Sequence, residues 1–288
     1  MTNWLVTVNL GGDKQSAQRR AGMRDWTERI LADGERRPVV IFAQEVFTGW
    51  LDLFSPRQWV VTLGTDQGWQ VRSAVVTSRA LAVTRVDDRT VSNLHYHGNY
   101  MAVARWERPG QQDIILASVH ASPNEADPEK YEWRGPLPEP RHGGRDERYV
   151  GSRLWDSDLL LATLRDLHST TGLPVLAGGD LNESLLYDFD TSGRQLGTWG
   201  KEYFELAHRY GLIPWLHKAW ADGNGHSERP TRGLYQLDHL LTTADAAELL
   251  GTEPLPHVDQ EWKDRAALDS LSDHAPVWTA FSESLNFG

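Results

Sequence analysis

The chain has 288 residues, of which 40% are hydrophobic and 24% are charged, as in ordinary globular proteins. These proportions exclude a disordered or collagen-like protein, and no run approaches the roughly twenty apolar residues of a transmembrane helix. Because 40 Asp and Glu outnumber 29 Lys and Arg, the formal net charge of −11 argues against binding nucleic acid through bulk positive charge.

Short runs rich in Val, Ile, Leu and aromatic residues recur along the chain and are typical of β-strands. They predict strands at residues 4–10, 39–46, 69–77, 101–106, 114–120, 174–178, 236–242 and 275–281. Longer stretches with one polar side predict helices at 14–32, 153–169 and 201–210. Since there is no internal repeat and no sign of a domain boundary, we expect residues 1–288 to form a single domain. The sequence shows no secretory signal, so we expect this domain in the cytoplasm.

Residues 124–151 are rich in proline and glycine and predict a long loop. A group of arginines lies in and just after this stretch, at Arg141, Arg145, Arg148 and Arg153. Two interpretations stay open. The loop is either a solvated insertion or a basic and aromatic lip that contacts the phosphates or bases of a substrate.

Several polar groups lie at the ends of the strand-like runs. They are Asn9, Glu45, His120, Asp180 with Asn182, Asp238, and Asp273 with His274. A carboxylate beside an apolar strand is costly to bury unless it is paired or bound to a metal ion. So many of them, spread over the whole chain, predict one shared centre.

The residue types of this centre suit a hard metal ion. Cysteine is absent, which excludes disulfides, thiolate nucleophiles and zinc fingers and leaves oxygen and imidazole as metal ligands. Asp, Glu and Asn oxygens favour Mg²⁺ or Mn²⁺, which also bind phosphate oxygens. With a carboxylate to orient water and an imidazole to stabilise charge, these groups indicate hydrolysis of a phosphate ester.

The motifs around these residues resemble those of a known family. They are Val8-Asn9-Leu10-Gly11, Gln44-Glu45, His120-Ala121-Ser122-Pro123, Gly179-Asp180-Leu181-Asn182, Leu237-Asp238-His239 and Ser272-Asp273-His274-Ala275-Pro276. In this order they resemble the endonuclease/exonuclease/phosphatase superfamily, and its deoxyribonuclease I-like members in particular. The resemblance implies a four-layered α/β sandwich, in which two packed, mainly antiparallel sheets are flanked by helices and the site lies at one end.

The resemblance implies a metal site with Mg²⁺ or Mn²⁺ as the ion. Glu45 would bind the ion, with Asn9 and Asp273 close to it. An alternative for Asn9 is a turn-forming role before the glycine pair at 11–12.

The resemblance also implies the catalytic roles. Asp180 would orient and deprotonate the attacking water, while Asn182 would hold the phosphate or that water. Asp238 would fix His274, whose imidazole binds a phosphoryl oxygen. His120 would assist the leaving group, and a purely structural role for this histidine stays open.

These roles predict a Mg²⁺- or Mn²⁺-dependent phosphodiesterase that acts on nucleic acid, that is, a nuclease. One alternative is a cytoplasmic phosphatase or phosphodiesterase whose substrate is a small or lipid-linked phosphate. A second is a binding module that has lost catalysis. The residues after Asn9 lack the acidic residue of abasic-site endonucleases, and a chain without cysteine lacks the inositol 5-phosphatase signature.

A further pattern concerns calcium. Asp188 and Asp190 begin a segment similar to a Ca²⁺-binding loop, but Trp199 stands where the closing glutamate belongs. The alternative is an ordinary acidic turn.

Overall fold

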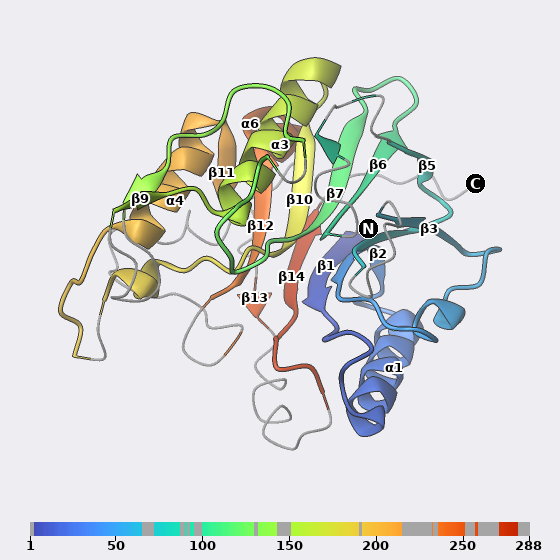
Figure 1. Cartoon of the computed structure of the whole chain (residues 1–288). Helices are drawn as coiled ribbons and strands as arrows, with labels where there is room; N and C mark the ends of the chain where they lie inside the picture. The colour runs from blue at the N-terminus through green and yellow to red at the C-terminus, as the bar shows by residue number, and fades with distance from the viewer. Residues whose placement is uncertain are drawn as a thin grey trace.

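The computed structural model describes residues 3–64, 72–86, 90, 93–94, 100–129, 132–142, 151–189, 192–214, 232, 236–250, 257–258 and 271–281. Within these ranges the chain forms two six-stranded sheets and one two-stranded sheet (Figure 1). None of the helices described is both long and apolar enough to cross a membrane.

The first large sheet, sheet A, has the strand order β13-β14-β1-β2-β4-β3. Its strands are β1 (Asn3–Asn9), β2 (Pro38–Gln44), β3 (Trp59–Leu63), β4 (Ala74–Ser78), β13 (His257–Val258) and β14 (Val277–Phe281). All neighbours in it are antiparallel except β1 and β2. The carboxyl ends of these two central strands therefore lie side by side at the same end of the sheet.

The second large sheet, sheet B, has the strand order β11-β12-β10-β7-β6-β5. Its strands are β5 (Ala82–Arg85), β6 (Met101–Glu107), β7 (Ile114–His120), β10 (Val175–Asp180), β11 (Leu212–Pro214) and β12 (Asp238–Thr243). It also contains a single parallel pair, β7 and β10. The expectation of mainly antiparallel sheets is confirmed, and the two parallel pairs become important for the site.

The two large sheets pack face to face. A Cβ atom added to Gly178 on β10 would lie only 2.5 Å from the ring of Phe42 on β2, so a glycine is required where the sheets approach most closely. Most of the buried apolar side chains of sheet A belong to the core between the sheets and under the first helix. A second core lies on the other side of sheet B.

Helices cover the outer sides of the sheet pair. The main helices are α1 (Ala17–Ala32), α3 (Asp156–Thr171), α4 (Trp199–Arg209) and α6 (Ala244–Leu249), with 3-10 turns η1 (Leu51–Leu53) and η3 (Leu185–Asp188). Helix α1 packs on sheet A through Trp26, whose ring meets Trp278 of β14 edge to face. Helices α3 and α4 cover sheet B, as Figure 1 shows. The four-layered α/β sandwich is thereby confirmed.

Local signals explain where the helices begin and end. The Ser16 hydroxyl accepts a hydrogen bond from the backbone N–H of Arg19, which caps the first turn of α1. Helix α3 ends at Gly172, which has the left-handed backbone conformation (φ 64°) common after a helix. The predicted helices and strands are confirmed with ends shifted by a few residues, although the segment 65–71 lies outside the described residues. The short strands β3, β5 and β11 and helix α6 were not predicted, because their local sequences carry weak periodicity and pairing with neighbours defines them.

The proline-rich segment 124–151 is partly tied to the fold. Its strand β8 (Arg141–His142) pairs with β9 (Ser152–Arg153), while residues 130–131 and 143–150 lie outside the description. The lip interpretation is wrong for Arg141, because its side chain is buried between Asp158 and Glu183. Arg153 contacts Glu125. Of the four arginines proposed for the lip, Arg145 and Arg148 fall among the residues not described.

Candidate active site

The parallel strand pairs bring the motif residues together. In sheet A, Asn9 ends β1 opposite Gln44, so Glu45 follows directly at the same edge. In sheet B, His120 and Asp180 end β7 and β10 opposite each other. Since the two sheets pack face to face, residues from both of them meet at one end of the sandwich.

The antiparallel neighbours complete this arrangement. Asp238 begins β12 and lies in register with Asp180 at the end of β10. His274 precedes β14, whose first residue, Val277, pairs with Thr7 near the end of β1. Six widely separated parts of the sequence therefore contribute to one site.

Asn9 joins the two sheets at this site. Its Nδ2 atom donates to Oε1 of Glu45 at 3.0 Å and to Oδ2 of Asp180 at 3.1 Å. Its Oδ1 atom accepts from the backbone N–H of Gly11 at 2.9 Å. The amide orientation is fixed, because one end faces two carboxylates and the other a backbone donor. Asn9 therefore closes the turn before the glycine pair and also lies among the candidate site residues, while its place beside an ion stays a prediction.

Glu45 and Asn182 share an uncommon backbone conformation. Their φ angles are 49° and 53°, in the left-handed region that costs a non-glycine residue about 1 kcal/mol or more. Glu45 is the first residue after β2, and Asn182 is the second residue after β10. Gly12 lies close by, since a Cβ on it would be 3.4 Å from Oε2 of Glu45. The chain thus holds strained backbone where two candidate site residues leave their strands.

Asp180 is buried at the centre of the group. Its Oδ1 atom accepts from the backbone N–H of Asn182 at 2.9 Å, while Oδ2 accepts from Asn9. Burial raises the pKa of Asp180, an effect that the nearby His274 opposes and the Asp238 carboxylate reinforces. A carboxylate with a raised pKa is a better proton acceptor than an exposed one.

His274 and Asp238 form a buried pair. Nδ1 of His274 lies 2.8 Å from Oδ2 of Asp238 and 3.7 Å from Oδ2 of Asp180. Burial alone would lower the pKa of His274, but Asp238 and Asp180 together raise it to about 9. The imidazole is therefore held as a cation at neutral pH, which suits a group that binds a negatively charged oxygen.

His120 lies beside the two carboxylates that Asn9 joins. Its Nε2 atom is 3.7 Å from Oε1 of Glu45 and 3.8 Å from Oδ2 of Asp180. The ring also contacts Tyr100, with ring centroids 5.5 Å apart. Its Nδ1 atom is buried and has no hydrogen-bond partner within the part of the chain that the structure describes. His120 therefore belongs to the site.

Asn182 and Asp273 occupy the borders of the site. Nδ2 of Asn182 donates to the carbonyl of Ala121 at 2.9 Å. Asp273 precedes His274, but its side chain is 40% exposed and its Oδ2 atom lies 3.0 Å from Nη2 of Arg232. The observed partner of the Asp273 side chain, Arg232, thus lies outside the central group.

Two places could hold a cation. Glu45 and Asp180 direct carboxylate oxygens at the same amide nitrogen, and the Glu45 side chain is 28% exposed, as a hydrated ion requires. Asp180, Asp238 and His274 also bring three potential ligand atoms within 4.8 Å of one another. However, the Asp238–His274 hydrogen bond occupies the second group. The Glu45 carboxylate, which is partly exposed, therefore suits a hydrated divalent ion better than the fully buried second group.

Gln44 supports the site, although the Gln44-Glu45 motif gave it no role of its own. Its buried Nε2 atom donates to Oγ of Ser118 at 3.0 Å and to the carbonyl of Gly178 at 3.3 Å. Ser118 in turn donates to the carbonyl of Ala43 at 2.8 Å. These bonds connect β2 with β7 and β10 just below the site. A glutamine within an otherwise apolar strand was the available signal.

Glu183, directly after Asn182, anchors the other side of the site. Its carboxylate accepts from Nη2 of Arg141 at 2.8 Å and from the Ser157 hydroxyl, while its carbonyl lies 2.9 Å from Nε2 of His239. Arg141 also pairs with Asp158 at 2.7 Å. This buried cluster holds the turn that carries Asn182.

The guanidinium of Arg141 also contacts aromatic rings. It lies 4.4 Å from the ring centre of Trp199 and 5.0 Å from that of Tyr203, both on α4. Stacking of this kind favours a desolvated arginine. Arg141 therefore has a structural role in the interior of the protein.

Asp188 serves as a helix cap. Its two carboxylate oxygens accept from the backbone N–H groups of Gly200 at 2.7 Å and Lys201 at 2.8 Å, at the start of α4. These bonds favour the acidic-turn interpretation over the calcium loop. Asp190, the other residue of that prediction, lies outside the described residues.

The sequence matches a family model described as the endonuclease/exonuclease/phosphatase family over residues 6–274. The chain therefore belongs to this family, as the motifs led us to expect. No curated protein sequence matches the chain.

Solved structures share the fold. Truncated Caenorhabditis elegans TDP2 is 15% identical, with a TM-score of 0.54 and 98% of each chain covered. An AP endonuclease from Archaeoglobus fulgidus is 15% identical, with a TM-score of 0.55, and the match covers 98% of this chain and 100% of that one. The Xenopus laevis APE2 catalytic domain is 14% identical, with a TM-score of 0.56, and the match covers 98% of this chain and 94% of that one. At these identities the likeness concerns the fold.

Proposed function

We propose that the protein is a divalent-metal-dependent phosphodiesterase that cleaves nucleic acid. The observation that carries this proposal is the convergence of Glu45, Asn9 and Asp180 beside the Asp238–His274 pair. The group contains a cation site, a buried proton acceptor and a charged imidazole, which are the requirements for hydrolysis of a phosphodiester.

In this proposal Glu45 holds the ion, and Asp273 is the second candidate ligand. The ion, Mg²⁺ or Mn²⁺, supplies neutralisation of phosphate charge when it is bound. Asn9 keeps the Glu45 and Asp180 carboxylates at a fixed separation through its two hydrogen bonds. Its role is to orient ligands, because its Oδ1 atom is occupied by Gly11.

The remaining residues perform the proton transfers. Asp180 orients a water molecule and accepts its proton as the oxygen attacks phosphorus. His274 donates a hydrogen bond to a phosphoryl oxygen, and its link to Asp238 keeps it protonated. Asn182 binds the phosphate or the water, and His120 assists departure of the leaving oxygen.

Two further lines support a polynucleotide substrate and a single working unit. Among the proteins of similar fold are AP endonucleases. We infer one domain over residues 1–288, because residues from Asn9 to His274 contribute to the same site. A cytoplasmic location stays a prediction.

A small or lipid-linked phosphate is the second candidate substrate. The net charge of −11 and the burial of Arg141 favour it, because both reduce the positive charge available to a long polyanion. Purified protein should be assayed with plasmid DNA, RNA and phosphomonoesters in Mg²⁺, Mn²⁺ and EDTA. Cleavage of a polynucleotide in either metal, with KM rising steeply with salt, supports the proposal. Metal-dependent hydrolysis of phosphomonoesters alone overturns it in favour of the second candidate, and inactivity on every substrate indicates a binding module.

A further inference from the structure

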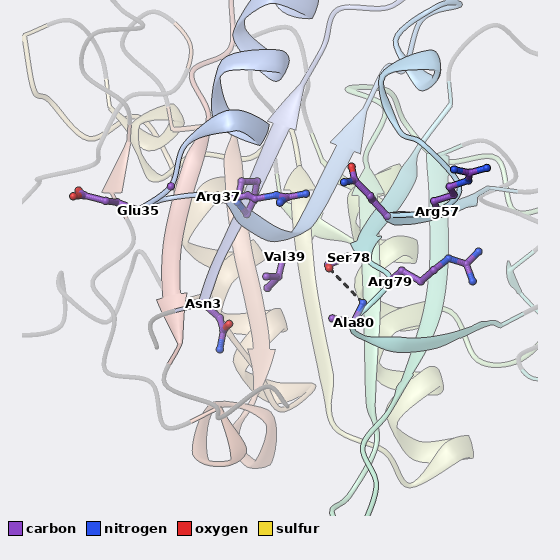
Figure 2. A pocket seen from close by; sticks show the side chains of 11 residues that line it. Asn3, Glu35, Arg37, Val39, Arg57, Ser78, Arg79 and Ala80 are labelled. Carbon is purple, nitrogen blue, oxygen red and sulfur yellow. Dashed lines mark hydrogen bonds between the residues drawn. The ribbon is translucent and has the colours of Figure 1, made fainter. Parts of the chain in front are cut away.

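A hollow of about 400 Å³ lies at the end of sheet A opposite the candidate active site. Strand β1 begins at this hollow with Asn3 and ends in the active site with Asn9. At about 3.3 Å per residue the strand separates the two places by roughly 20 Å. The hollow is therefore a distinct feature of the molecule (Figure 2).

Three arginines come to this hollow from three neighbouring strands. Arg37 precedes β2, Arg79 follows β4, and Arg57 lies two residues before β3. Because β4 is antiparallel to both β2 and β3, the start of β2, the end of β4 and the start of β3 lie side by side. Pairing is continuous there, since the N–H of Arg79 donates to the carbonyl of Gln58 at 2.7 Å. The topology thus gathers positive charge at one sheet end.

Two of these guanidinium groups are held in place by the protein. The guanidinium of Arg37 lies 5.4 Å from the ring centre of Trp59, which is itself buried. Nε of Arg79 donates to the carbonyl of Pro56 at 2.8 Å. A stacked or singly bonded guanidinium retains further N–H donors along its edge.

The positive charge of the hollow is not neutralised within it. Among the residues that the structure describes, Arg37, Arg57 and Arg79 make no ion pair with a carboxylate. Glu35 also lines the hollow, but Figure 2 shows its side chain pointing away from the side where Arg57 and Arg79 lie. Three arginines against one glutamate leave a net charge of about +2 in a chain whose total is −11.

We propose that this hollow, the arginine pocket, binds a phosphate group. A phosphate monoester carries a charge of about −1.5 to −2 at neutral pH and accepts bidentate hydrogen bonds from arginine. Val39 and Ala80 add apolar wall, and the volume suits a small organic ligand. The phosphate would belong to a free organic phosphate or to the end of a polynucleotide, which present the same chemistry.

The pocket can be tested on the full chain in EDTA by NMR of backbone amides. The probes are inorganic phosphate, a nucleoside monophosphate and an oligonucleotide with a terminal phosphate. We expect saturable shifts at Ala80 and Gln58 with phosphate, and a rise of about tenfold or more in Kd for R57S/R79S. Arg36→Ser is the matched control, because Arg36 lies on Trp4 outside the pocket.

The three probes distinguish the sources of the phosphate. A lower Kd for the monophosphate than for the oligonucleotide assigns the pocket to a free organic phosphate, and the reverse order assigns it to a polynucleotide end. Shifts confined to Asp180 and its neighbours, or equal loss of affinity in Arg36→Ser, overturn the proposal. Turnover of a generic phosphodiester should be unchanged in R57S/R79S, which separates this test from that of the proposed function.

Discussion

Oδ2 of Asp238 lies 2.8 Å from Nδ1 of His274, and both side chains are buried. Asp238 is also in register with Asp180 across the β10–β12 pair. Nδ1 of the imidazole therefore faces two carboxylates, one in hydrogen-bond contact and one 3.7 Å away. The charge state of His274 depends on both of them.

This pair predicts a pH dependence of stability. The folded-state pKa of His274 is about 9, above its ordinary value of 6.5. A raised histidine pKa stabilises the fold fully below pH 6.5, and this stabilisation is lost as the pH rises through 9, for a total of about 3 kcal/mol. Urea unfolding in EDTA on both sides of this window should show the loss. Asp238→Asn should flatten the dependence, and an unchanged slope in that variant would contradict the assignment.

Removal of Asp180 should abolish turnover without unfolding the protein. Asp180→Asn keeps the size of the side chain but removes the proton acceptor, so kcat should fall by about a thousandfold or more. Steady-state kinetics on plasmid DNA in Mg²⁺ measures this loss. Asp166→Asn on α3, at a partly buried position that pairs with Arg165 away from the site, is a matched control that should retain full activity. Wild-type turnover by Asp180→Asn rules out the proposed role.

Two substitutions at Asn182 separate backbone strain from chemistry. Its φ of 53° suits glycine better than alanine, so Asn182→Gly should be more stable than Asn182→Ala by about 1 kcal/mol. Both variants lose the side-chain amide and should lose turnover to a similar extent. Thermal unfolding and kcat, measured on the same preparations, give the two comparisons. Wild-type turnover by Asn182→Gly would show that the amide has no chemical role.

The buried ion pairs of Arg141 with Asp158 and Glu183 predict that loss of one charge strongly lowers the free energy of unfolding. Arg141→Met would leave Glu183 and Asp158 buried without their cation and should cost about 3–5 kcal/mol of stability. The triple variant with Glu183→Gln and Asp158→Asn removes the uncompensated charges and should recover part of that loss. Denaturant titration measures both. A triple variant less stable than Arg141→Met would contradict the idea that the uncompensated charges of Glu183 and Asp158 cause the loss.

The sequence was sufficient to locate most of the site, because its polar residues lie at strand ends. A polar residue such as Asp180 after an apolar run can be recognised without knowing its neighbours. The partners could not be recognised in this way. From its local surroundings Arg141 was expected in a solvated insertion or in a lip that contacts substrate, whereas its burial depends on Asp158 and Glu183, from other parts of the chain. Local charge does not determine whether a side chain faces water.

The backbone conformations of the site were also beyond the sequence. Nothing in the composition around Glu45 indicates a left-handed residue, since glutamate seldom adopts that conformation. It occurs where the chain leaves β2, and Gly12 lies beside the Glu45 side chain there. Short strands such as β5 were missed for a related reason, because they form by pairing with a neighbour.

The bonds of Gln44 across the sheets have a consequence for how the protein responds to mild denaturation. The candidate site residues are divided between the two sheets, with Asn9 and Glu45 on sheet A and Asp180 on sheet B. A small slide of one sheet past the other would separate them while every strand kept its neighbours. Heat or denaturant should therefore abolish activity under conditions where circular dichroism still records native secondary structure. The hydrogen bonds of Gln44 between the sheets oppose this relative movement.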